Sequence, residues 1–363
     1  MDSSPDGKNG KPNAFKRAQV RHKRQGSKPN RTDDLAQFVD FANPTNDDRV
    51  VHVQHEVKNN EEYQGPVYEL AAYPGFLCAP QALSVELQTH LGYLAVSEFC
   101  ERPHATNIGL VEPKANEVVL ENLTMWELWK SQSVTGPRKG SDANHYRSFN
   151  KLSWATMGYQ YDWTERAYHE DAKSPVPPIL DGLATKFAKL SMRLEKAEST
   201  SFNPSACIVN YYGLKSTMGG HRDDLELALN KPVISFSMGL PAVFLLGGET
   251  KDEVPVVPIL VRPGDVMILG GASRLNYHGM ARLIPNEVVL PEAELRFQSP
   301  QPYQLDIGEK GNGHVDDEKE VTEFLRTHRI NINVRQVLPD GLDCFPSVAS
   351  KRLDTDGPQT AAV

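Results

Sequence analysis

Two histidines and one aspartate have the types and the spacing of a mononuclear iron site. His221 and Asp223 lie two residues apart in MGGHRDDLELALN, residues 218–230, and His278 follows 55 residues after Asp223. In an extended segment, residues i and i+2 project from the same face, so this imidazole and carboxylate would converge on one point. Two imidazoles and one carboxylate suit Fe(II) and leave positions open for an oxidant and a co-substrate. We therefore predict that His221, Asp223 and His278 are metal ligands and catalytic residues.

The same letters permit other interpretations. His-Arg-Asp opens the catalytic loop of protein kinases, but that loop needs an Asn five residues after the Asp, and position 228 is Ala. The chain also lacks the kinase Gly-rich loop and Asp-Phe-Gly, so a kinase is excluded. Two more His-x-Asp matches, at residues 169–171 and 314–316, lie in polar stretches without flanking strands. We expect both of these matches to be surface loops.

The segment RININVR, residues 329–335, alternates strictly between apolar and polar residues. Ile330, Ile332 and Val334 would share one strand face, and the other face would carry Arg329, Asn331, Asn333 and Arg335. On an inner face these arginines would be costly without anionic partners, whereas a dicarboxylate beside the metal would match a guanidinium fork. Asn210 and Tyr212 share a face of the strand ACIVNYY and could bind the same ligand. The alternative is the exposed face of an edge strand.

The elements that would hold these residues are short strands. From about residue 205 the chain contains ACIVNYY, PVISFSMG, AVFLLGG, VVPILV, DVMILGG and RININVR, separated by Gly, Pro and Asp. Many short strands at this spacing favour a sandwich, barrel or jelly roll over roughly residues 200–340. Upstream, leucines at helical spacing predict a helix over 81–99, and a second helix begins after Pro177 and Pro178. We therefore expect an α+β fold with helices packed against the β domain.

Composition restricts the class of protein. A chain of 363 residues that is 39% hydrophobic and 24% charged can bury a substantial core, which excludes global disorder. No apolar run approaches the roughly 18 residues that a membrane span needs, and the N-terminus has no apolar core of a signal peptide. The four cysteines are widely spaced, as in reduced thiols of an intracellular protein.

The net charge of -8 is distributed unevenly. Residues 1–31 contain nine Lys and Arg against Asp2 and Asp6, a charge of +7, which leaves -15 for residues 32–363. A basic arm with few apolar residues is predicted to be disordered. It would be a nuclear signal, an arm that attracts nucleic acid, or simply a solvated tail. The two early acids disfavour a mitochondrial transit peptide.

A second basic stretch precedes a group of aromatic residues. Residues 136–151, GPRKGSDANHYRSFNK, contain Arg138 and Lys139, and the following WATMGYQYDW contains Trp154, Tyr159 and Tyr161. Interleaved basic and aromatic residues favour contact with single-stranded nucleic acid. Ordinary loop charge and core aromatics are the alternative, and the acidic body opposes a phosphate-bearing substrate.

The pattern NYY…HRD…NYH…RININVR resembles the AlkB family of Fe(II)/2-oxoglutarate nucleic-acid dioxygenases, and its AlkB homologue 1 branch most of all. The resemblance covers roughly residues 150–340. It implies a double-stranded β-helix (jelly roll) that carries a nucleotide-recognition lid. On this resemblance the domains are a basic arm (1–35), an N-terminal extension with helices (36–150), a lid with its supporting helix (151–200), the β domain (201–340) and a tail (341–363).

The resemblance also implies roles for individual residues. His221, Asp223 and His278 would hold iron. Arg329 would pair with the distal carboxylate of 2-oxoglutarate, helped by Tyr212 and Asn210, while Asn331 and Arg335 would support the co-substrate or the metal-bound carboxylate. Tyr211 is assigned to the same co-substrate set, and substrate contacts are assigned to Trp154, Tyr159, Tyr161, Arg138 and Lys139. Position 225 departs from the bacterial pattern, because Leu225 stands where an Asp contributes to base recognition.

The implied reaction uses Fe(II), 2-oxoglutarate and O2. It would oxidatively demethylate N-methylated bases, 1-methyladenine in tRNA or methyladenine in DNA, and release formaldehyde, succinate and CO2. The implied partner is tRNA or single-stranded or flipped-base DNA, with no membrane and no obligate protein partner, in the nucleus, cytoplasm or mitochondrion. The alternatives are a dioxygenase acting on protein or a small molecule, and a non-enzymatic nucleic-acid-binding protein with a relict site.

Overall fold

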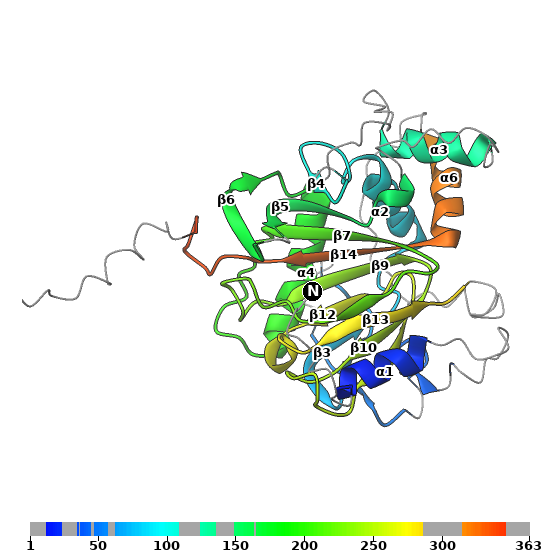
Figure 1. Ribbon diagram of the computed structural model, residues 1–363. Coiled ribbons are helices and arrows are strands. Elements are labelled where there is room, and N and C mark those ends of the chain that lie inside the picture. The colour runs from blue at the N-terminus through cyan, green and yellow to red at the C-terminus, as the bar shows by residue number, and fades with distance from the viewer. Residues whose placement is uncertain are drawn as a thin grey trace, which may run out of the picture.

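The computed structural model describes residues 12–23, 35, 37–44, 47–56, 62–108, 124–135, 149–162, 165–285 and 314–345. Two antiparallel sheets face each other (Figure 1). A cavity lies between them. The large sheet has the order β1 (Val50–Val53), β2 (Val67–Leu70), β3 (Tyr73–Ala79), β12 (Val266–Leu269), β9 (Val233–Gly239), β14 (His328–Arg335), β7 (Ala206–Gly213), β5 (Trp154–Asp162) and β4 (Ala105–Thr106), with β6 (Ala167–Lys173) paired to β5. The small sheet has the order β11 (Val257–Val261), β10 (Ala242–Leu246), β13 (His278–Leu283) and β8 (Met218–His221).

The chain passes repeatedly between the two sheets. β7, β9, β12 and β14 belong to the large sheet, while β8, β10, β11 and β13, which lie between them in sequence, belong to the small one. This alternation is the winding of a double-stranded β-helix, so the predicted fold class is confirmed. The upstream strands β1 to β4 extend the large sheet at both edges, because β3 pairs with β12 and β4 pairs with β5.

Helices cover the outer face of the large sheet. Here α2 (Val85–Ser97), α3 (Met125–Thr135), α4 (Pro178–Leu194) and α6 (His314–Thr327) pack around the main core, beside the 3-10 turn Phe149–Lys151; a second 3-10 turn, Gly271–Ser273, precedes β13. The N-terminus of α2 is capped by Ser84, whose Oγ accepts a hydrogen bond from the Leu87 N–H at 3.2 Å. The α4 helix begins at Pro178, where a missing N–H costs nothing. Both helices lie where the leucine spacing and the proline pair predicted them.

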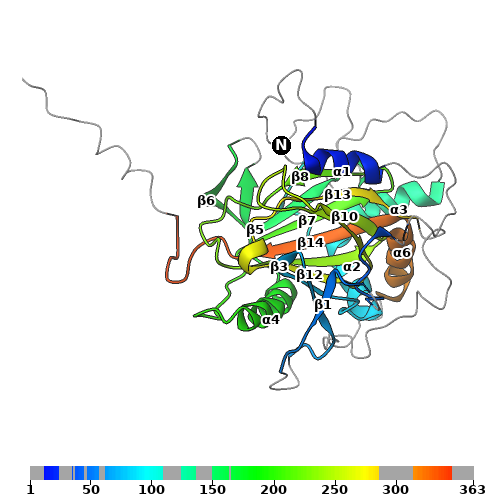
Figure 2. The same ribbon diagram turned by 90° about the horizontal axis from the view of Figure 1, so that it is seen from below.

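A segment of the basic arm is helical, which corrects the prediction of disorder there. Residues Ala14–Lys23 form α1, which lies on the outer face of the small sheet, on the opposite side of the molecule from α4 (Figure 2). Phe15 is 2% exposed and packs in a cluster with Val243, Leu245 and Ala281. Disorder was predicted from charge, but Ala14, Phe15, Gln19 and His22 form a buried helix face, and the Lys and Arg side chains are exposed.

Two predicted surface loops have regular structure instead. His169 and Asp171 lie on β6, which forms a hairpin with β5, and His314 begins α6. A polar strand was missed because β6, among the described strands, pairs with β5 alone and so needs no apolar alternation. No described helix is both long enough and apolar enough to cross a membrane.

Candidate metal and co-substrate site

Adjacent strands bring the three predicted ligands together. His221 ends β8 and is the direct partner of His278, the first residue of β13. The centroids of the two imidazoles are 4.4 Å apart, and His278 Nε2 lies 3.9 Å from Asp223 Oδ2. One ligand-type atom from each of His221, Asp223 and His278 lies within 4.8 Å of the other two. Three such atoms, two nitrogens and one oxygen, can reach a single ion.

The ring orientations favour metal binding. Nδ1 of His221 lies 3.0 Å from the Gly219 carbonyl oxygen, and Nδ1 of His278 lies 3.0 Å from that of Asn276. If each Nδ1 carries the proton and donates it to the carbonyl oxygen, each Nε2 is unprotonated, and its lone pair is available to bind a metal. Burial lowers the pKa of His278 to about 4, so this ring is neutral at pH 7. Burial opposes ionisation of Asp223, but the positive charges around it, that of Arg335 first, together outweigh burial and hold the pKa of this carboxyl well below its usual range.

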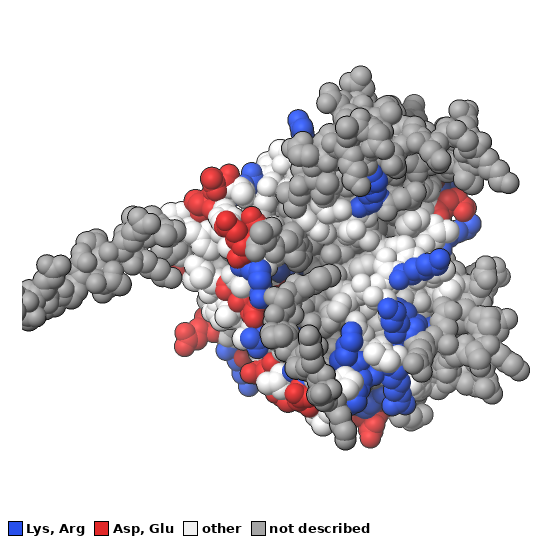
Figure 3. Space-filling model, in the orientation of Figure 1, with Lys and Arg blue, Asp and Glu red and all other residues white. Residues whose placement is uncertain are grey.

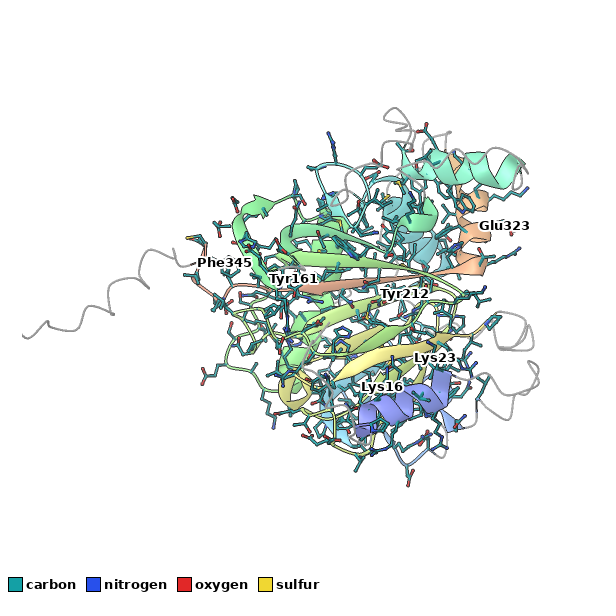
Figure 4. The ribbon with its side chains drawn as sticks, viewed as in Figure 1. Lys16, Lys23, Tyr161, Tyr212, Glu323 and Phe345 are labelled. Carbon is teal, nitrogen blue, oxygen red and sulfur yellow. The ribbon has the colours of Figure 1, made fainter. Side chains whose placement is uncertain are left out.

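The ligands lie in a cavity of about 540 Å³, a volume that includes its open mouth, between the two sheets. Its apolar wall includes Phe244, Met267 and Met280, and its polar wall includes Tyr212 and Arg329. Figure 4 labels Tyr212, which projects from β7 toward this cavity. An apolar pocket with a few convergent polar groups is the usual form of a small-molecule site.

Arg329 places a buried positive charge in this wall. Its guanidinium is 4% exposed and donates to Ser237 Oγ at 2.9 Å and to the Leu240 carbonyl oxygen at 3.3 Å. Within the described part of the chain no carboxylate pairs with it, and burial lowers its pKa only to about 10. A buried cation that remains charged at pH 7 calls for an anionic partner. The cavity therefore fits a carboxylate ligand on Arg329 beside a metal held by His221, Asp223 and His278.

The other polar residues follow the strand register. Residues directly opposite in antiparallel strands share a face, so Trp154, Asn210, Asn331 and Ser237 form one row across β5, β7, β14 and β9. Asn331 lines the cavity and donates to Ser235 Oγ at 2.8 Å, whereas Asn210 is buried in the same row without lining the cavity.

Tyr211 does not lie where it was assigned, whereas Arg335 lies beside the metal-binding carboxylate, one of the two roles assigned to it. Tyr211 points to the opposite face of β7, and its hydroxyl donates to the Ala95 carbonyl oxygen of α2 at 2.5 Å. The alternation of a strand separates it from Asn210 and Tyr212, so it does not reach the co-substrate cavity. Arg335 lies behind the cavity, where its Nη2 is 3.1 Å from Asp223 Oδ2, so it supports the metal-binding carboxylate.

Two charged residues behind Asp223 escaped the sequence analysis. Glu226 and Arg274 are each 3% exposed, and they pair at 3.0 Å. Glu226 also accepts from Arg335 Nη1 at 3.1 Å, and Arg274 Nη1 donates to the backbone carbonyl oxygen of Asp223 at 2.5 Å. The one signal in the sequence was the position of Glu226, an acid three residues after Asp223. That spacing does not reveal its distant partners, Arg274 and Arg335.

The aromatic residues assigned to the substrate lie on β5 and do not line the described cavity. Tyr159 is 6% exposed and packs edge-on against Phe345, with its hydroxyl donating to Glu170 at 3.0 Å. Tyr161 packs against Tyr168 of β6, and Figure 4 shows Tyr161 and Phe345 together at this end of the molecule. Trp154 is half-buried on the cavity-side row. Arg138 and Lys139 lie outside the described residues.

This fold and site define a class of enzyme, the Fe(II)/2-oxoglutarate dioxygenases. Residues 109–335 match the family model described as the 2OG-Fe(II) oxygenase superfamily. The chain belongs to this superfamily and, within it, to the AlkB homologue 1 group. Membership implies Fe(II), 2-oxoglutarate and O2 as the requirements of the enzyme.

Relatives with curated names match over most of the chain. Over 354 residues it is 31% identical to "DNA N(6)-methyladenine demethylase ALKBH1A" of Arabidopsis thaliana, covering 89% of this chain and 96% of that one. Over 283 residues it is 32% identical to "Nucleic acid dioxygenase ALKBH1" of Mus musculus, covering 77% and 68%. Over 190 residues it is 34% identical to "tRNA demethylase abh1" of Schizosaccharomyces pombe, covering 52% and 54%.

Proposed function

We propose that this protein oxidatively demethylates N-methylated bases in nucleic acid, with conversion of 2-oxoglutarate to succinate and CO2 and release of formaldehyde. The observation that carries the proposal is one cavity in which two imidazoles and a carboxylate converge beside the unneutralised Arg329. The names of three relatives, two demethylases and a nucleic-acid dioxygenase, support the substrate class.

The residues of the chain would share the work as follows. His221, Asp223 and His278 would hold Fe(II), which supplies the oxidation chemistry. Arg329 would bind the distal carboxylate of 2-oxoglutarate, and its hydrogen bonds to Ser237 and Leu240 keep the guanidinium from turning. Apolar residues such as Phe244 and Met280 would exclude water from the reacting atoms. Trp154, on the cavity-side row, would contact a flipped-out base.

Replacement of the buried arginine tests co-substrate binding. In Arg329→Gln the charge is lost, so we expect the KM for 2-oxoglutarate to rise about 10²-fold, since breaking a buried charge pair costs about 2–5 kcal/mol. Succinate formation measured against 2-oxoglutarate concentration gives the KM. The matched control is Arg326→Gln, because Arg326 is largely exposed on α6. A wild-type KM in Arg329→Gln would contradict the assignment.

The exposed face of α1 would contact the phosphate backbone. Lys16, Arg17, Arg21 and Lys23 are all exposed on this helix, which carries no acid. Lys and Arg side chains gather over α1, on the visible face of Figure 3. The helix also contacts β8, the edge strand that carries His221, so this basic face is carried on the outer side of the strand that holds a metal ligand. An acidic body with a local basic face can still bind a polyanion.

Two lysine pairs test this interaction. Lys16→Gln with Lys23→Gln should weaken binding to an oligonucleotide and lower the slope of log affinity against log salt concentration by about one for each phosphate that is no longer neutralised. The control pair, Lys186→Gln with Lys189→Gln, lies on α4 on the opposite side of the molecule. Equal affinities and equal slopes for the two double variants would place nucleic acid elsewhere.

A direct screen tests the whole proposal. Full-length protein with Fe(II), ascorbate and 2-oxoglutarate is incubated with tRNA and DNA oligonucleotides that contain 1-methyladenine, N6-methyladenine or methylcytosine, and with methylated peptides. Nucleoside mass spectrometry and formaldehyde release report demethylation. We expect loss of the methyl group from at least one nucleic acid. Activity on peptides alone would refute the proposal.

A further inference from the structure

The buried acid that follows Asp223 along the chain does not face the cavity. Leu225 packs against the hairpin β5–β6, in the cluster that contains Tyr159 and Tyr168. Glu226, one residue later, is turned behind the metal ligands, is 3% exposed and does not line the cavity. A buried carboxylate at this position has no role in contacting the base, so its partners indicate its purpose.

Glu226 connects the hairpin to Asp223. Tyr168 of β6 donates its hydroxyl proton to Glu226 Oε1 at 2.8 Å, and Arg335 Nη1 donates to the same oxygen at 3.1 Å. The other terminal nitrogen of Arg335 lies 3.1 Å from Asp223 Oδ2. A continuous chain of hydrogen bonds therefore runs from the hairpin through Glu226 and Arg335 to the carboxylate that would hold the metal.

The charges in this chain are balanced. Arg274 and Arg335 carry two positive charges, and Asp223 and Glu226 carry two negative ones. Without the charge of Glu226, both guanidinium groups would be drawn toward Asp223, whose oxygens would become poorer donors to a cation. Glu226 and Asp223 thus share Arg335, because one terminal nitrogen of the guanidinium contacts each carboxylate, and Glu226 takes part of the positive charge that would otherwise fall on Asp223 alone.

The two strands of the hairpin are held differently: β5 pairs with β7 and β4 of the large sheet, whereas β6 is the outer strand. In the described part of the chain, β6 pairs with β5 alone, and its register is interrupted between Tyr159 and Tyr161. The buried hydroxyl of Tyr168 is its polar link to the region behind the metal ligands, and a displaced hairpin would withdraw this donor from Glu226.

We propose that Glu226 is a positioning residue that links the β5–β6 hairpin to the metal-binding carboxylate of Asp223 through Arg335, so that the position of the hairpin controls the donor geometry of Asp223. This inference rests on the proposed function for the identity of the substrate that moves the hairpin. When the hairpin is in the position that the structure shows, with Tyr168 bonded to Glu226, consumption of 2-oxoglutarate is coupled to demethylation of the substrate. With the hairpin displaced, 2-oxoglutarate and O2 are converted to succinate and CO2 without a demethylated product, and ascorbate supplies the two electrons that the substrate would otherwise supply.

Three variants of the full-length protein test the linkage. Glu226→Gln removes the charge with little change of shape, and Tyr168→Phe removes only the hydroxyl. Tyr159→Phe is the control, because its hydroxyl lies on the same hairpin but bonds Glu170, which is not connected to Asp223. Circular dichroism and the unfolding temperature identify variants that do not fold. If Glu226→Gln does not fold, Tyr168→Phe is used for the test instead.

The first readout is the affinity for Co(II), titrated by visible absorption without any nucleic acid. Loss of a group behind a metal ligand weakens metal binding about 10- to 100-fold, and we expect this for Glu226→Gln but not for Tyr159→Phe. The second readout is the ratio of succinate to demethylated nucleoside, which should rise several-fold in Tyr168→Phe.

Wild-type Co(II) affinity in Glu226→Gln, or the same succinate-to-product ratio in Tyr168→Phe and Tyr159→Phe, would overturn the linkage. The outcome is separable from the proposed function. If the wild-type protein demethylates no nucleic acid, the proposed function fails, and the Co(II) titration still decides whether Glu226 positions Asp223.

Discussion

Phe15 anchors α1 to the strand that carries a metal ligand, so removing its ring should loosen the site from outside. The ring fits against two glycines: a Cβ added at Gly220 would lie 2.5 Å from it, and one at Gly247 would lie 3.1 Å from it. Phe15 also donates its backbone N–H to the Lys251 carbonyl oxygen at 2.9 Å. Gly220 directly precedes His221, so the ring buttresses the end of β8.

The size of the effect follows from burial. Replacing a fully buried Phe by Ala costs about 3–5 kcal/mol. We expect α1 to separate from the small sheet without unfolding the rest, so this cost should raise the population of undocked helix by about 10²- to 4 × 10³-fold. The global unfolding temperature falls less than a core substitution would suggest, because the loss is limited to the docking free energy of one helix.

Limited trypsin digestion measures the undocked population directly. Arg17 and Arg21 lie within α1, and cleavage there requires the helix to open. We expect Phe15→Ala to be cut faster than wild type by about 10²-fold or more and to bind Co(II) more weakly. Val20→Ala is the control, because Val20 is on the same helix and 45% exposed. If Phe15→Ala and Val20→Ala are cut at the same rate, α1 does not depend on Phe15 for its docking.

Three further predictions concern packing, pH and ligands. Gly220→Ala would force the Phe15 ring aside at a cost of about 1–3 kcal/mol, seen as a lower unfolding temperature and weaker Co(II) binding. Burial raises the pKa of Asp265 to about 7, from 3.8, so its protonated form is favoured by the folded state. Protonated Asp265 therefore adds up to about 4 kcal/mol to the free energy of unfolding. This contribution is complete below about pH 4 and is lost by about pH 7. Denaturant unfolding across that range should show this decline in wild type but not in Asp265→Asn, and equal slopes would refute the assignment. Finally, a metal at 100 times its Kd should raise the free energy of unfolding by about 2.7 kcal/mol, and a chelator should abolish the gain; His278→Ala should show neither effect.

The parts of the site that the sequence predicted depend on local spacing. His221 and Asp223 are two residues apart on an extended segment, and Arg329 and Asn331 share a face by simple alternation. The same rule would have excluded Tyr211, because it cannot share a face with both Asn210 and Tyr212. Strand alternation therefore predicts most of the residues that line the cavity. It also argues against one co-substrate assignment, that of Tyr211.

The parts that were missed depend on contacts between distant residues. Tyr168 and Glu226 are 58 positions apart, and Gln19 of α1 donates to the Met218 carbonyl oxygen across 199 positions. Neither contact can be predicted from the residue types or the spacing near either partner. The docking of α1 was hidden further because its charged residues dominate the composition of the segment, while a few buried residues determine where it lies.

Leu225 bears on which methylated base the cavity can prefer. A cationic base such as 1-methyladenine is often stabilised by an acidic neighbour, and here the residue two positions after Asp223 is apolar and turned toward the hairpin tyrosines. Leu225 has no charge, so it does not favour a charged base over a neutral one such as N6-methyladenine. Discrimination between them would fall to ring shape and to the depth at which the methyl group sits.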